Sequence, residues 1–247
     1  MSRKLSPEFE TGAVLREQLD YYRERAAEYD QWWLRQGRYD RGPEQKAQWF
    51  AEASEVRAAL VAFRPGGRVL ELACGTGIWT ERLLPFADEL TAIDGSREML
   101  AINAGRLRSP RVRYIEADLF RWRPTPGGRF DTIFFGFWIS HVPPEKFADF
   151  WDLVDSCLAP RGRIFFLDSR YQETSTAVNH VLPERSATVL QRRLNDGREY
   201  RVYKIFYDRD KLTRRLAELG WSFEFEETRN YFICGAGSRI SQETGNG

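Results

Sequence analysis

Short apolar runs alternate with amphipathic segments from Val69 onward. Apolar runs of this length predict buried strands, and the segments between them predict helices. Strands are expected at 68–73, 89–94, 111–117, 130–137 and 162–168, and helices at 77–87, 96–107 and 144–158. This alternation favours an α/β fold with a doubly wound, mostly parallel sheet that carries helices on both faces.

The segment before this alternation predicts two helices. One is expected over 12–36, where Gly37 ends it, and the second over 43–63, with Pro43 in its first turn. Tyr22, Tyr29 and Trp33 fall on one face of the first helix by their spacing. This N-terminal helical arm, 1–42, is expected to dock on the core, to close over the site as a lid, or to do both. Residues 1–11 are expected to be mobile.

The C-terminal part departs from simple alternation. A strand is expected at 199–207, a helix at 209–220 and one long strand or two at 221–234. The stretch 169–198 reads as an insertion with mixed helical character at 174–195. We therefore divide the chain into the arm, a domain at 43–237 that contains the insertion, and a flexible tail at 238–247.

Composition narrows the classes of function. The 247 residues include 37 basic and 36 acidic side chains, a net charge of +1, which argues against a dedicated nucleic-acid surface. Three widely spaced cysteines indicate neither a disulfide framework nor a zinc site, and no metal site is readable from ligand spacing. The chain shows no apolar run suited to a membrane span and no signal-peptide pattern at 1–10, so a cytoplasmic location is expected.

A glycine turn follows the first predicted strand and opens onto a helical pattern. Gly75 and Gly77 allow positive φ and close approach of a ligand to the backbone. A dinucleotide fingerprint would carry a third glycine where Thr80 stands, and a phosphate-binding P-loop would carry a lysine that the turn lacks. Glu71 ends the strand, where its carboxylate would repel a pyrophosphate but suit an ammonium or a sulfonium.

The run Glu71-Leu-Ala-Cys-Gly-Thr-Gly77 resembles the first motif of class I S-adenosylmethionine-dependent methyltransferases, an acidic residue followed by x-x-x-Gly-x-Gly. The resemblance extends over 22–237 at the level of the fold, and its specific motifs lie within 71–141. It implies a seven-stranded Rossmann-like sheet with an antiparallel last strand, and S-adenosylmethionine as cofactor. The cofactor residues implied in this motif are Glu71, Ala73, Cys74, Gly75, Thr76 and Gly77.

Further cofactor residues are expected after the second predicted strand. Asp94 follows Gly77 by 17 residues, where an acid accepts both ribose hydroxyls, with Gly95 and Ser96 beside it. The alternative is that Asp94 caps the helix that begins at Ser96. Met99, on the first turn of that helix, would lie against the adenine ring.

The ends of the third and fourth strands are expected to complete the cofactor site. By resemblance, Asp118 accepts the adenine amino group with Leu119 and Phe120 beside the ring; the alternative is an Asx turn that ends the strand. Gly136 permits close approach of the methionine part. The run Gly136-Phe-Trp-Ile139 replaces the Asn/Asp-Pro-Pro-Tyr/Phe of relatives that methylate nucleobase amines or glutamine amides, which argues against those acceptors. The doubled-glutamate loop of protein arginine methyltransferases is not visible either.

His141 and Tyr22 are the candidate catalytic residues. An imidazole with an ordinary pKa near 6.5 can take a proton from an acceptor at neutral pH. The alternative is a structural histidine that packs against Trp138 and Pro143. The arm contributes Tyr29 to the cofactor site, and weaker candidates for the pocket are His180, Asp168 and Tyr171.

These features predict transfer of a methyl group from S-adenosylmethionine to a small-molecule acceptor by in-line displacement. The accepting atom, whether oxygen, nitrogen, sulfur or carbon, stays open. We expect no nucleic-acid or membrane partner and a monomer or homodimer. Two alternatives remain: a protein of the same fold with a non-methylating role, such as a cyclase or binding module, and an NAD-dependent oxidoreductase.

Overall fold

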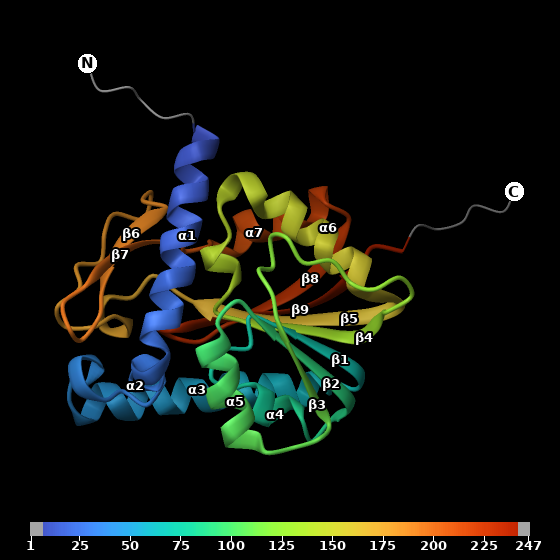
Figure 1. The fold of residues 1–247 in the computed structure, drawn as a ribbon, viewed down its shortest axis with the longest axis horizontal. Coiled ribbons are helices and arrows are strands. Elements are labelled where there is room, and N and C mark those ends of the chain that lie inside the picture. Colours follow the sequence, from blue (N-terminus) through green and yellow to red (C-terminus); the bar gives the residue numbers. More distant parts are fainter. Residues whose placement is uncertain (1–6, 242–247) are drawn as a thin grey trace, which may run out of the picture.

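A seven-stranded sheet forms the centre of the molecule in this computed structural model, which describes residues 7–241 (Figure 1). Its order is β3-β2-β1-β4-β5-β9-β8, and β9 runs antiparallel to both of its neighbours. The strands are β1 Gly67–Leu72, β2 Ala87–Asp94, β3 Val112–Glu116, β4 Phe130–Gly136, β5 Leu158–Ser169, β8 Trp221–Glu227 and β9 Phe232–Arg239. The predicted Rossmann-like sheet with an antiparallel last strand is confirmed.

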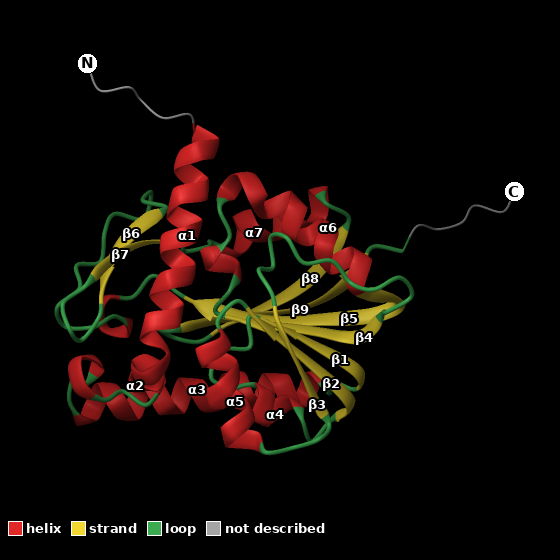
Figure 2. Cartoon of the chain, viewed as in Figure 1, coloured by secondary structure: helices red, strands yellow, loops and turns green. Residues whose placement is uncertain are grey.

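Helices cover both faces of this sheet (Figure 2). They are α1 Pro7–Arg25, α2 Tyr29–Trp33, α3 Pro43–Phe63, α4 Thr80–Leu83, α5 Arg97–Leu107, α6 Phe147–Cys157 and α7 Arg209–Glu218. Adjacent residues of one strand pack against helices on opposite faces of the sheet. Phe134 packs with α3, α4 and α5, whereas Phe135 packs with α6 and α7. Because successive side chains of a strand point to opposite faces, each central strand serves both apolar cores.

The N-terminal arm differs from the single helix predicted over 12–36. Helix α1 begins at Pro7 and ends at Arg25, and a 3₁₀ turn over Ala26–Glu28 precedes α2. The turn redirects the chain so that Trp32 and Trp33 pack against Trp49 of α3, with ring centroids 5.3 and 5.8 Å apart. Packing of large aromatic rings therefore overrides a continuous helix here. Residues 7–11, which fall in the segment expected to be mobile, belong to α1, and residues 1–6 lie outside the described part.

The helix predicted at 77–87 is mostly turn. After Gly77 only Thr80–Leu83 is α-helical, and β2 already begins at Ala87. The backbone N–H of Gly77 donates to the carbonyl of Cys74, which closes a tight turn where the helix was expected to start. The helices at 43–63 and 97–107 agree with the prediction, and 144–158 contains a 3₁₀ turn followed by α6.

The predicted insertion contains the first strand of a hairpin, and of the helical character expected over 174–195 only the 3₁₀ turn Glu173–Ser175 is present. Strands β6 (Val189–Arg193) and β7 (Glu199–Tyr203) pair with each other as a separate antiparallel sheet. The strand expected at 199–207 therefore ends at Tyr203 and lies outside the main sheet. Leu190, Leu194 and Val202 form a small apolar cluster with Tyr21 of α1. Burial of this cluster explains why the hairpin lies beside α1, as Figure 1 shows on the left.

The last strand extends beyond residue 237, where the domain was predicted to end. Strand β9 continues to Arg239, so the first two residues of the predicted tail belong to the sheet, and residues 242–247 lie outside the described part. Within residues 7–241, no helix combines the length and apolar character required to cross a bilayer.

Candidate active site

The site lies where the sheet order changes direction. From β1 the chain moves outward to β2 on one side, and it later returns to β4 on the other side, so β1 has parallel neighbours on both edges. Loops that leave the carboxyl ends of such strands part at this point and open a crevice. A cavity of about 390 Å³ occupies it, lined by the ends of β1 to β4 and by α1.

The two glycines of the turn have different roles. Gly75 (φ +53°) lines the cavity, and a Cβ there would meet nothing within 4 Å. Gly77 (φ +90°) does not line it; a Cβ there would lie 2.5 Å from Oδ1 of Asn103 on α5. Glycine at 75 therefore leaves room for a ligand, and glycine at 77 lets α5 approach the turn.

Asp94 links the turn to the end of β2. Its Oδ2 accepts a hydrogen bond from the backbone N–H of Gly75 at 2.9 Å, and its Oδ1 accepts one from the N–H of Ser96 at 2.9 Å. Burial raises the pKa of the Asp94 carboxyl to about 6, although these hydrogen bonds oppose the shift. The carboxylate faces the cavity, and each oxygen keeps a further lone pair for a ligand hydroxyl.

The third strand ends in a similar arrangement. Oδ1 of Asp118 accepts a hydrogen bond from the N–H of Phe120 at 3.0 Å, which is the Asx turn considered as the alternative role. The same residue lines the cavity together with Leu119, Phe120 and Met99. The turn and a ligand contact are thus compatible at Asp118.

Ten predicted cofactor residues line the large cavity: Tyr29, Ala73, Gly75, Asp94, Gly95, Met99, Asp118, Leu119, Phe120 and Gly136. Glu71, Cys74 and Thr76 instead line a smaller cavity under the turn. Gly77 and Ser96 line neither; the hydroxyl of Ser96 accepts the N–H of Met99 and caps α5. Burial raises the pKa of Glu71 to about 8, and its Oε2 has no hydrogen-bond partner among the described atoms.

Tyr22 and His141 meet at the edge of the large cavity. The ring nitrogen Nδ1 of His141 lies 2.5 Å from the carbonyl oxygen of Tyr203 and donates its hydrogen to it. This fixes the tautomer, so Nε2 accepts the hydroxyl of Tyr22 at 2.8 Å. Burial and the charge of Lys204 hold the pKa of His141 well below its usual value, which keeps the imidazole neutral.

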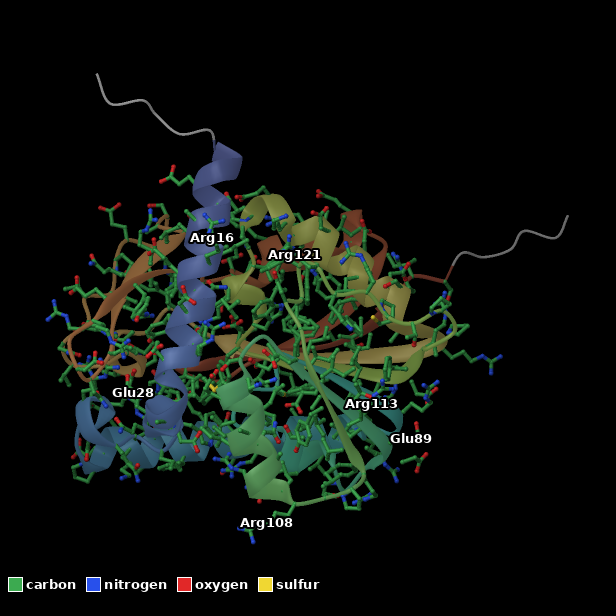
Figure 3. The ribbon with its side chains drawn as sticks, viewed as in Figure 1. Arg16, Glu28, Glu89, Arg108, Arg113 and Arg121 are labelled. Atoms are coloured by element: carbon green, nitrogen blue, oxygen red, sulfur yellow. The ribbon has the colours of Figure 1, made fainter. Side chains whose placement is uncertain are left out.

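Helix α1 supplies cavity residues that the sequence analysis did not name. They are Gly12, Leu15, Arg16, Gln18 and Leu19. Figure 3 labels Arg16 on α1 and Arg121 in the segment after β3, and both line the cavity. Gly12, Leu15, Leu19 and Tyr22 follow one helical face, so extending the face of Tyr22 backwards along the chain would have identified them.

A second cavity of about 70 Å³ adjoins the first on the side of the β6–β7 hairpin. Both are lined by Tyr22, Tyr29, Phe137 and His141. The rest of its wall comes mainly from α1, α2 and the segments around the hairpin, and includes Tyr21, Arg25, Tyr39, His180, Arg192, Lys204 and Phe206. We call this space the hairpin cavity.

Of the three weaker candidates, only His180 lines the hairpin cavity. Asp168 is buried and accepts hydrogen bonds from the N–H of Ser140 and from Nζ of Lys204, both at 3.0 Å. The hydroxyl of Tyr171 donates to the carbonyl of Pro183 at 2.7 Å. Asp168 and Tyr171 therefore support the wall rather than line it. Among the described residues, no group of three or more His, Cys, Asp or Glu could hold a metal ion.

Comparison with known proteins places this geometry in a family. A family model described as a methyltransferase domain matches residues 69–162. Trans-aconitate 2-methyltransferase of Sinorhizobium medicae is 34% identical over 131 residues, which are 52% of this chain and 48% of the relative. Demethylmenaquinone methyltransferase of Renibacterium salmoninarum is 27% identical over 64% of this chain and 68% of its own length. The chain spans about half the length of the first of these relatives.

Two solved structures are similar to this chain over nearly its whole length. A complex titled DhpI-SAH is 35% identical, covers 94% of this chain and 99% of the other, and has a TM-score of 0.73. A methyltransferase of Burkholderia thailandensis with bound 1,6-didemethyltoxoflavin and S-adenosylhomocysteine is 17% identical, covers 98% of this chain and 94% of its own, and has a TM-score of 0.60. At that identity the second similarity concerns the fold alone.

Proposed function

The chain belongs to the class I S-adenosylmethionine-dependent methyltransferases, and we propose that it transfers a methyl group to a small-molecule acceptor. The observation that carries the proposal is the large cavity at the β1/β4 switch point, which is lined by Gly75, Asp94 and Gly136 and by the arm. S-adenosylmethionine is the cofactor, and when bound it supplies a methyl group on a positively charged sulfur.

The residues around the large cavity suit each part of that cofactor. Asp94, whose two oxygens keep lone pairs beside their backbone hydrogen bonds, would accept the ribose hydroxyls. Met99, Leu119 and Phe120 would enclose the adenine ring, with Asp118 at its amino group. The smaller cavity under the turn shares Ala73, Gly75 and Gly136 with the large one, and there the unpartnered oxygen of Glu71 would meet the ammonium of the methionine part.

Tyr22 and His141 stand between the large cavity, which we call the cofactor cavity, and the hairpin cavity. A neutral imidazole whose pKa lies well below its usual value is a weak base at neutral pH. We therefore assign the pair mainly to positioning: Nε2 of His141 holds the Tyr22 hydroxyl, and the two side chains orient the acceptor. In-line displacement at a sulfonium depends chiefly on such orientation and on exclusion of water.

An NAD-dependent oxidoreductase is the weaker alternative. Thr80 replaces the third glycine of a dinucleotide fingerprint. Glu71 adds an acidic group at the smaller cavity under the turn, and none of the described residues that line this cavity is basic, which does not suit a pyrophosphate. A non-methylating role on the same fold would keep the cofactor cavity and change only the products. Product analysis distinguishes these possibilities.

The test is turnover with S-adenosylmethionine whose methyl group carries deuterium. The protein is incubated with a panel of compact acids, alcohols, amines and thiols, and products are analysed by mass spectrometry. We expect the labelled methyl group on one acceptor, and an amount of S-adenosylhomocysteine equal to that of the methylated product. Tight binding of S-adenosylmethionine with its conversion to another product would instead favour a cyclase.

We also propose the compartment and the assembly state in which the protein acts. Cys74, Cys157 and Cys234 are buried free thiols, which suits a reducing compartment such as the cytoplasm. We propose that the protein acts there on a small molecule, as a monomer or homodimer and without nucleic acid.

A further inference from the structure

The hairpin cavity contains a buried arginine without a counter-charge. Arg25, in the last turn of α1, is 8% exposed. Its Nη2 donates to the hydroxyl of Tyr39 at 3.1 Å, while its Nε has no hydrogen-bond partner. The guanidinium carbon lies 4.8 Å from the ring centroid of Tyr29 and 5.5 Å from that of Tyr21. No ion pair links Arg25 to a described carboxylate.

A second guanidinium lines the same cavity from the hairpin. Arg192, on β6, is half-buried, and its Nη1 lies 3.2 Å from Nδ1 of His180. It too forms no ion pair with a described carboxylate. Lys204 adds a third cation, but Asp168 compensates it at 3.0 Å. Two of the three positive charges around the cavity are therefore uncompensated.

This distribution of charge is costly unless a ligand balances it. An arginine keeps its charge at any accessible pH, and a buried charge without a counter-charge is strongly destabilising. Among the described residues that line the hairpin cavity, none is Asp or Glu. Guanidinium groups bind the oxygens of carboxylates and phosphates in paired, charge-assisted hydrogen bonds.

The cavity is also placed where an acceptor must bind. Its wall toward the cofactor cavity consists of Tyr22, Tyr29, Phe137 and His141. A molecule held by Arg25 and Arg192 would therefore lie against these four residues, next to the cavity that would hold the methyl donor. At about 10–15 Å³ for each water-sized volume, the cavity of about 70 Å³ has room for a molecule of roughly half a dozen non-hydrogen atoms.

We propose that the hairpin cavity is an oxyanion subsite, in which Arg25 and Arg192 hold a carboxylate or phosphate-type group of the methyl acceptor. This inference rests on the proposed function and names its substrate class: a compact anionic acceptor. Arg25 comes from the arm and Arg192 from the hairpin, so the two segments outside the main sheet together select the acceptor.

The experiment titrates inorganic phosphate and acetate into the protein saturated with S-adenosylhomocysteine, at constant ionic strength, by calorimetry. The variants are Arg25→Gln, Arg25→Lys and Arg192→Gln. The matched control is Arg113→Gln, which removes an exposed arginine on β3, on the opposite side of the view in Figure 3 from the hairpin. Circular dichroism confirms folding, and Arg192→Gln, at a half-buried position, keeps the test valid if Arg25→Gln does not fold.

The wild-type protein is expected to bind at least one of the two anions, with affinity lowered tenfold or more in Arg25→Gln and Arg192→Gln and unchanged in Arg113→Gln. Preference for phosphate would identify a phosphate-type acceptor, and preference for acetate a carboxylate. Binding of neither anion, or an equal loss in Arg113→Gln, would overturn the subsite. Titration of S-adenosylhomocysteine into the wild type and the same variants distinguishes failure of the subsite from failure of the proposed function. If S-adenosylhomocysteine does not bind the wild type, the methyltransferase function itself is contradicted.

Discussion

The hydroxyl of Tyr22 lies 2.8 Å from Nε2 of His141, across 119 residues of sequence. The two rings meet edge to face, with centroids 5.4 Å apart. Tyr22 belongs to α1 and His141 to the 3₁₀ turn after β4, so this contact joins the arm to the strand that borders the switch point. The arm is thereby part of the site rather than an appendage docked elsewhere on the core.

The state of His141 predicts the pH dependence of turnover. Its pKa lies well below the usual value of about 6.5, so protonation in the folded protein requires a more acidic medium. At saturating S-adenosylmethionine, kcat/KM for the acceptor should stay constant from pH 8 down to pH 6. A decline with a midpoint near 6.5 that disappears in His141→Gln would contradict this assignment and restore an ordinary catalytic base.

In contrast to turnover, cofactor binding is expected to depend on pH, because of Asp94. Burial raises its pKa to about 6 in the free protein, and only the ionised carboxylate accepts both ribose hydroxyls. Affinity for S-adenosylhomocysteine should therefore rise with pH and be about tenfold weaker at pH 5 than at pH 7. Calorimetry across this range checks it. Asp94→Asn should bind weakly with little pH dependence, and an unchanged slope in that variant would assign the titration to another group.

The two glycines of the turn predict distinct defects. Gly77→Ala places a Cβ against Asn103 at a positive φ and should lower the free energy of unfolding by about 3 kcal/mol. Gly75→Ala has open space around it and should cost only about 1 kcal/mol from its left-handed backbone, while weakening S-adenosylhomocysteine binding. Chemical denaturation and calorimetry measure the two quantities. Equal stability losses in both variants would contradict the role of Asn103.

The position of α1 predicts protection of the arm by the cofactor. Leu15, Arg16, Leu19 and Tyr22 line the cofactor cavity, so a ligand there gains contacts with the helix. Trypsin cleavage after Arg23 and Arg25 should slow severalfold with saturating S-adenosylhomocysteine, since ligand binding stabilises the closed state. Cleavage after the exposed Arg229, in the turn between β8 and β9, is the internal control. Equal rates at Arg23 with and without ligand would remove the lid role.

The central sheet and most of the cofactor cavity were predictable from sequence because their signals are local. Apolar runs marked β1 to β5, and Gly75, Asp94 and Asp118 stand at strand ends, which a parallel sheet gathers at one edge. The hairpin cavity was not predictable in the same way. Arg25 stands beside Arg23 in a charged helix turn, and the sequence does not show which of the two is buried. Arg192 reaches the cavity only because β6 pairs with β7, a contact set by packing on Tyr21.

The most direct test of the methyltransferase assignment is calorimetric titration of the wild type and Asp94→Ala with S-adenosylmethionine, S-adenosylhomocysteine and NAD. We expect the two adenosyl-sulfur ligands to bind with Kd on the order of micromolar, an affinity tenfold or more weaker in Asp94→Ala, and no comparable binding of NAD. Binding of NAD in preference to both, or failure of either sulfur ligand to bind, would contradict the methyltransferase assignment.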